Sequence, residues 1–112
     1  MSLVQEEIVR LSGIYYQYVG LGHHKDRDCH WCIETAYSYG QPPTFMAHHS
    51  GYRYDYWTGE RRATYAEAEA DLLLTLRKAL DEAEAWATKA ANDPEDWCGD
   101  EAREALEVLR GR

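Results

Sequence analysis

The longest run of regularly spaced apolar residues lies in the second half of the chain and predicts a helix over residues 64–91. Thr64 and Glu67 have capping-box spacing, in which the hydroxyl accepts from the amide three residues on and the carboxylate accepts from the threonine amide. A helix of this length would measure roughly 42 Å, so its C-terminal part should extend beyond the sheet beside it. Its apolar face comprises Tyr65, Ala68, Leu72, Leu76, Leu80, Ala83, Trp86 and Ala90.

Two shorter patterns predict helices at the ends of the chain. The first covers residues 1–20, with Ser2 in position to cap it. Because residues 14–16 are also strand-like, a helix over 3–12 followed by a strand is the alternative. The apolar face of this helix would comprise Val4, Ile8, Leu11, Tyr15 and Tyr18.

The last helix is predicted over residues 94–110, with Asp93 as its N-cap and Pro94 in its first position. Either this helix, folded back as an αα-hairpin, or a second subunit would cover the part of the long helix that projects from the sheet. Its inward face would comprise Ala102, Leu106 and Leu109.

Between the helices the pattern changes to a period of two, which predicts strands over residues 28–57. The first runs over 28–39, and two more over 44–49 and 52–57. Pairing about the centre of the 40–43 turn would place Ile33 opposite His49 or Ser50. One face of the first strand would carry Cys29, Trp31, Ile33, Thr35, Tyr37 and Tyr39, and the other would carry His30, Cys32 and Glu34.

Residues 1–112 are therefore predicted to form a single α+β domain of order α-β-β-β-α. An antiparallel sheet of three to four strands would pack on one long helix, and a C-terminal helix would follow. Double-stranded-RNA-binding domains share this order, but topology alone implies no function. Their phosphate contacts need basic residues at the start of the last domain helix, where this chain has Glu67, Glu69 and Asp71.

The net charge of −8 also argues against double-stranded RNA or DNA as a partner, because affinity for phosphates comes from Lys and Arg. An acidic surface instead favours basic partners. No apolar run approaches the roughly 18 residues of a membrane span, and the N-terminus has Glu6 and Glu7 where a signal peptide would be basic. With three cysteines in no disulfide-rich spacing, we expect a cytoplasmic protein without membrane contact.

The densest chemistry lies in residues 23–32, which hold three His, two Cys and two Asp. Cys29 and Cys32 have C-x-x-C spacing, but residues three apart on a strand face opposite ways, which disfavours redox chemistry. Zinc is the cofactor that the cluster would allow, and otherwise we predict none. Its candidate ligands are His30, Cys32, His48 and His23.

The same segment supports a catalytic hypothesis of the hydrolase or phosphodiesterase type. His23 or His24 would be the general base, and Asp26 or Asp28 would orient it. His30 is a further candidate, and His48 or His49 would complete the site from a neighbouring strand. The alternative is a polar loop without catalysis, in which the Asp side chains pair with Arg27 or cap the turn.

Aromatic residues give a third hypothesis, because the chain has nine Tyr and four Trp but one Phe. Rings on the sheet face away from the long helix would be partly exposed, as at protein interfaces, although cross-strand stabilisation explains them equally well. The predicted binding residues are Tyr37, Tyr39, Tyr52, Tyr54, Tyr56 and Trp57.

The sequence thus favours a small, acidic, soluble protein-interaction or regulatory module without catalysis. Its partner would be another protein or a second copy of the chain, and we expect a homodimer. The alternative is a small metal- or His/Asp-dependent enzyme centred on residues 23–32.

Overall fold

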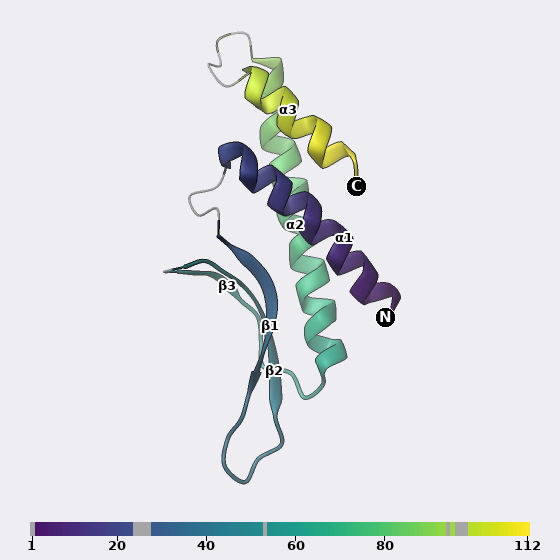
Figure 1. The fold of residues 1–112 in the computed structure, drawn as a ribbon, viewed down its shortest axis with the longest axis vertical. Coiled ribbons are helices and arrows are strands. Elements are labelled where there is room, and N and C mark those ends of the chain that lie inside the picture. Colours follow the sequence, from purple (N-terminus) through teal and green to yellow (C-terminus); the bar gives the residue numbers. More distant parts are fainter. Residues whose placement is uncertain (1, 24–27, 53, 94, 96–98) are drawn as a thin grey trace.

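The computed structural model, which describes residues 2–23, 28–52, 54–93, 95 and 99–112, has two helices on one side of an antiparallel sheet and a third helix beyond the end of the sheet (Figure 1). The predicted α+β class and the antiparallel sheet are confirmed, and the described residues form three strands. In chain order the elements are α1 (Leu3–Tyr18), a π-helical turn η1 (Val19–His23), β1 (His30–Ala36), β2 (Thr44–Ser50), β3 (Asp55–Thr58), α2 (Tyr65–Asn92) and α3 (Gly99–Arg110).

The first helix runs without a break to Tyr18, so the alternative of a strand after residue 12 is wrong. Ser2 and Gln5 form a capping box at its start. Leu11, Tyr15 and Tyr18 are all buried, because helical spacing places them on one face against the core.

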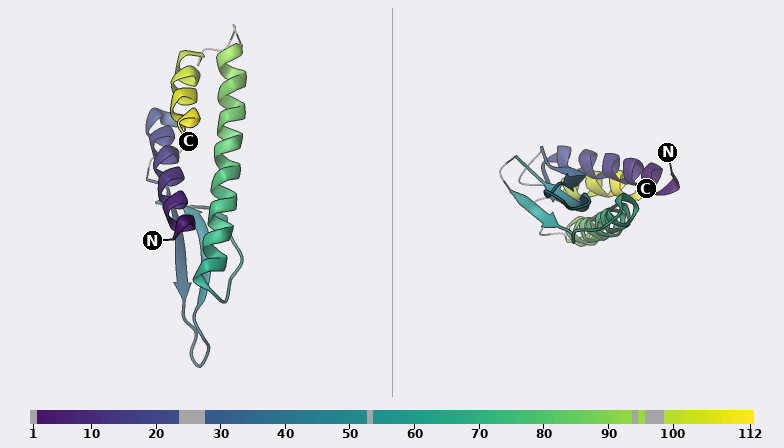
Figure 2. Two further views of the ribbon diagram at one scale, coloured as in Figure 1. Left: turned by 90° about the vertical axis from the view of Figure 1, so that its right-hand side faces the viewer. Right: turned by 90° about the horizontal axis from the view of Figure 1, so that it is seen from below.

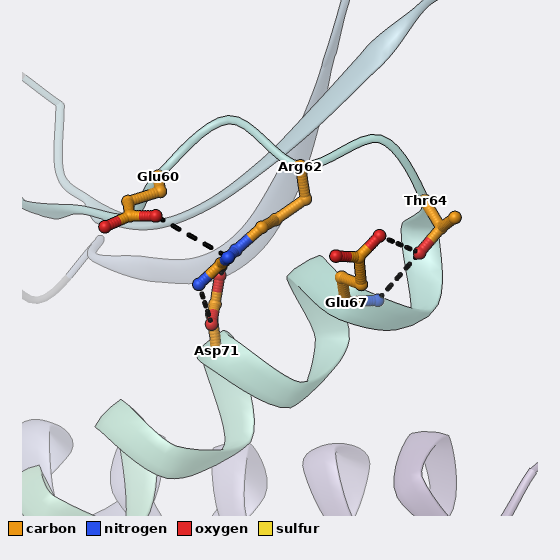
Figure 3. Close-up of polar contacts among 5 residues, drawn as sticks. All are labelled: Glu60, Arg62, Thr64, Glu67 and Asp71. Carbon is orange, nitrogen blue, oxygen red and sulfur yellow. Dashed lines mark hydrogen bonds and ion pairs between the residues drawn. The ribbon is translucent and has the colours of Figure 1, made fainter.

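The long helix α2 covers the sheet with its first half and projects beyond it with its second half (Figure 2). Of the two predicted arrangements, the αα-hairpin is the one observed. Helix α3 folds back along the projecting half of α2 and buries Ala102, Ala105, Leu106 and Leu109. At the start of α2, the Glu67 amide donates to the Thr64 hydroxyl as predicted. The Glu67 carboxylate, however, accepts from the Thr64 hydroxyl, not from the Thr64 amide (Figure 3).

The last helix begins later than predicted, at Gly99. Asp93 is the C-cap of α2, and its carboxylate accepts from the Glu95 amide, so it stabilises a turn instead of starting a helix. Pro94, the predicted first helical residue, lies outside the described residues.

Within the sheet, β2 lies between β1 and β3. Ile33 pairs with Ala47, so the predicted pairing with His49 or Ser50 is wrong by at least two residues. The pairing of β1 with β2 is centred on Gly40, which has a φ of 73°. The prediction had centred it on the middle of the 40–43 turn. Because the strand period is two, a shift of two residues leaves each side chain on its predicted face.

After β3, the segment that leads into α2 continues to pair with the same edge of β2. The Gly59 amide donates to the Ala47 carbonyl, and Phe45 and Arg62 exchange two backbone hydrogen bonds. Arg62 then makes two hydrogen bonds to Asp71, at 2.8 and 3.1 Å, and lies 3.5 Å from Glu60 (Figure 3). This bidentate pair fixes α2 to the sheet.

Candidate functional site

Two of the predicted metal ligands meet on the sheet face opposite the helices. Cys32 and His48 are register partners on β1 and β2, and the Cys32 Sγ lies 3.2 Å from the His48 Nε2. Glu34, two residues along β1, places a carboxylate oxygen 3.7 Å from the same nitrogen. The structure thus brings two of the candidate ligands into contact, while metal binding by them stays a prediction.

The side chains of His48 and Glu34 are not arranged to activate the Cys32 sulfur as a nucleophile. In a Cys–His–acid relay the acid holds one ring nitrogen and the other faces the sulfur, whereas here Cys32 and Glu34 both approach Nε2. Burial raises the pKa of the Cys32 thiol, and the acidic groups of Glu34 and Asp55 raise it further, against a hydrogen bond from Ser50 that lowers it. A thiolate nucleophile needs the opposite environment, so Cys32 stays protonated near neutral pH.

Of the remaining metal and catalytic candidates, those that the structure describes do not join this pair. His30 is exposed and lies opposite Ser50, with its ring 6.5 Å from that of Tyr16. Asp28 is exposed in the turn before β1. The side chain of His23, and the whole of His24 and Asp26, lie outside the described residues. In the part of the chain that the structure describes, no group of three or more His, Cys, Asp or Glu is placed to hold a metal ion.

His49, the other histidine considered for catalysis, faces the core. It is buried against Trp31, with the rings 4.1 Å apart, and against the edge of Tyr15. Packing on both sides leaves this imidazole no route to a substrate on the outer face.

The six predicted binding aromatics lie in three places. Tyr37 and Tyr39 are exposed in the loop after β1, whereas Tyr52 and Tyr54 are exposed in the loop after β2, at the opposite end of the sheet. In β3, Trp57 packs against the core, while the ring of Tyr56 lies 5.2 Å from that of His49.

A site that the sequence analysis missed lies along β1, the strand at the side of the sheet. The Trp31 amide donates to the Tyr16 hydroxyl at 2.9 Å and so points away from β2. In an antiparallel pair, residues alternate between facing the partner strand and facing away from it. The backbone N–H and C=O groups of Ile33 and Thr35 therefore face the same open edge as the Trp31 amide.

An apolar groove of about 420 Å³ runs beside this edge, between β1 and the first halves of α1 and α2. Val9 on α1 is 61 % exposed and Tyr65 on α2 is 46 % exposed. We call this space the β1 groove. Its walls are Gln5, Ile8, Val9, Trp31, Cys32, Ile33, Tyr65, Glu69 and Leu72.

Glu69 is the charged residue of this lining, and only 7 % of its surface is exposed. From the sequence, Glu69 is only one of three acids in the first turns of α2 that argue against RNA binding. The signal that was overlooked is its spacing, because it follows Tyr65 by four residues and precedes Leu72 by three, on the apolar face of the helix.

No described helix is long and apolar enough to cross a membrane. Comparisons of the chain with protein-family models, with curated proteins and with solved structures find no match.

Proposed function

We propose that this protein is an interaction module that binds an extended segment of a partner protein as an additional strand on β1. The observation that carries the proposal is the open backbone edge of β1 beside an apolar groove. Added strands gain affinity from backbone hydrogen bonds and specificity from pockets for alternate side chains, and this surface offers both.

The sequence of β1 supports this use of its edge. Exposed edge strands are normally protected by Lys, Pro, bulges or shortness, because they pair readily with other chains. β1 has seven residues, contains neither Lys nor Pro, and pairs with β2 without a bulge. The part of β1 from Ile33 to Thr35, past the amide that Tyr16 occupies, is therefore suited to pairing with a further strand.

The module needs no catalytic step. The Cys32 thiol has a raised pKa, and His48 offers one nitrogen to both of its polar neighbours. Neither property favours proton transfer or nucleophilic attack.

A second copy of the chain is the other occupant that the edge allows, and a homodimer is what the sequence analysis expected. Two β1 strands paired antiparallel about Ile33 would need Trp31 opposite Thr35 of the second copy. The Trp31 amide already donates to Tyr16 in each copy, so both ends of this symmetric ladder would be blocked, whereas a partner segment would be blocked at one end. We therefore take a segment of another protein as the occupant.

Selection of displayed random peptides on the immobilised protein tests the proposal. Val9→Lys, which puts a positive charge and a longer side chain at the wall of the β1 groove, should abolish binding of the selected peptides. Leu74→Lys is the matched control, because Leu74 is an exposed apolar residue of α2 outside the groove, and binding should persist.

Methylation of peptide amides then tests the binding mode. Methyl groups on alternate amides, those that face β1, should weaken binding about tenfold or more, and those on the amides between them should not. Equal sensitivity at all amides would contradict strand addition. A dimer in light scattering that Val9→Lys dissociates would make the second copy the occupant instead.

Zinc binding at the Cys32–His48 pair is the second candidate function, favoured by their 3.2 Å contact. Sulfur and imidazole nitrogen are common zinc ligands, and Glu34 is the nearest further donor. Such a site would be the basis of the hydrolase-type alternative. Elemental analysis should then find stoichiometric zinc that is lost in Cys32→Ser and retained in Glu104→Gln, a control on α3.

A further inference from the structure

Glu69 differs from the neighbouring acids on α2, Glu67 and Asp71, in how its carboxylate is paired. The carboxylate of Glu67 accepts a hydrogen bond from Thr64, three residues before it, and that of Asp71 accepts from Arg62, nine residues before it. Glu69 is more deeply buried than either, yet it has no hydrogen bond or ion pair among the described residues. Buried carboxylates are normally paired, because removing a charge from water is costly.

The β1 groove is where this carboxylate meets solvent. Glu69 lines the groove, and the other lining residues that the structure describes are uncharged. An apolar side chain that filled the groove would strip the remaining water from Glu69 and leave its charge unpaired. A cationic side chain would keep the apolar contacts of its stem and pair its charge with the carboxylate.

The surroundings suit a long cationic side chain. Ile8, Val9 and Leu72 provide apolar walls for a methylene stem on the way to Glu69. The net charge of −8 attracts basic segments over longer range.

We infer that the segment bound at β1 places a lysine or arginine side chain in the β1 groove, where Glu69 pairs with its charge. This inference rests on the proposed function, since it names the side chain that the added strand carries into the groove. It excludes segments whose groove residue is acidic or purely apolar.

The experiment uses the peptides selected on the full-length protein. They should share a Lys or Arg at one position, and the probe is a synthetic selected peptide with lysine or with norleucine, which keeps the stem and removes the charge. On the wild-type protein, norleucine should weaken binding about tenfold, which corresponds to about 1.4 kcal/mol.

The Glu69→Gln variant should bind both peptides with nearly equal affinity, whereas Glu104→Gln, an exposed acid on α3, should keep the wild-type preference. Urea unfolding checks that Glu69→Gln is folded, as expected when an unpaired buried charge is removed. Equal binding of the two peptides to the wild type, or a lysine preference that survives Glu69→Gln, would overturn the inference while strand addition stands. A protein that selects no peptide would overturn the proposed function itself.

Discussion

The indole of Trp31 and the imidazole of His49 stack face to face, with centroids 4.1 Å apart and planes 8° apart. They are register partners on β1 and β2. Because the Trp31 amide bonds to Tyr16, this is a pair without mutual backbone hydrogen bonds, the kind in which side chains lie closest. The stack therefore joins the two strands on the face that meets the helices.

Trp31→Ala should be strongly destabilising, because it removes the stack and leaves a cavity against Tyr15. We expect a loss of about 3–5 kcal/mol in the free energy of unfolding. Urea denaturation measures it, with Tyr39→Ala as the control, since that ring is fully exposed and should change stability by about 0.5 kcal/mol or less. Similar losses of stability for the two variants would contradict the packing of the Trp31 ring against His49 and Tyr15.

Tyr16→Phe should lower the stability by about 1 kcal/mol, because the Trp31 amide loses its acceptor. Hydrogen exchange provides the specific readout, in which the Trp31 amide should exchange faster while amides of β2 that pair with β1 change little. Tyr37→Phe, a change at an exposed loop residue, should leave both quantities unaltered. An unchanged exchange rate at Trp31 would show that Tyr16 does not protect the edge.

Two glycine-to-alanine changes should act in opposite directions. A Cβ at Gly59 would lie 3.0 Å from the Trp57 ring and 3.1 Å from the Ala47 carbonyl oxygen, to which Gly59 itself is bonded. Gly59→Ala should therefore cost about 1–3 kcal/mol. Gly13 lies inside α1 with open space around it, so Gly13→Ala should stabilise by about 1 kcal/mol. Thermal unfolding measures both changes in stability. If both had the same sign, the space around one of the two glycines would differ from that described above.

The Arg62–Asp71 pair should couple measurably in a double-mutant cycle with Arg62→Met and Asp71→Asn, because it is bidentate and joins two elements. The coupling should shrink as salt is added. Arg103 and Asp100 form an ion pair within one turn of α3, with both side chains exposed, and their cycle is the control. A larger coupling energy for Arg103 and Asp100 would show that bidentate geometry does not determine which pair couples more strongly.

Alkylation of Cys32 should follow its raised pKa. A higher pKa lowers the thiolate fraction near neutral pH, so iodoacetamide should react more slowly with the folded protein than with the protein unfolded in urea. The midpoint of the pH–rate profile should also lie higher in the folded protein. Mass spectrometry of the peptide that contains Cys32 separates it from the other cysteines, and a lower midpoint would instead indicate an activated nucleophile.

Local patterns determined much of this protein. Helical spacing predicted α2 and the face of α1, since side chains three and four apart must share a face whatever they pack against. Strand alternation predicted that Cys32 and His48 share the outer face, and this survived an error of two residues in register because the strand period is two. These features depend on the chain within a few residues, which is the range that a sequence pattern describes.

Tertiary structure alone decided which edge of the sheet stays open and what lies beside it. The β1 groove exists because α1 crosses β1 at Tyr15 and Tyr16 and leaves its first turns away from the strand. Glu69 is buried in the wall of this groove, although the neighbouring Glu67 in the same part of α2 is exposed. Such features depend on contacts between residues far apart in the chain, whose geometry is set by the packing of the whole core.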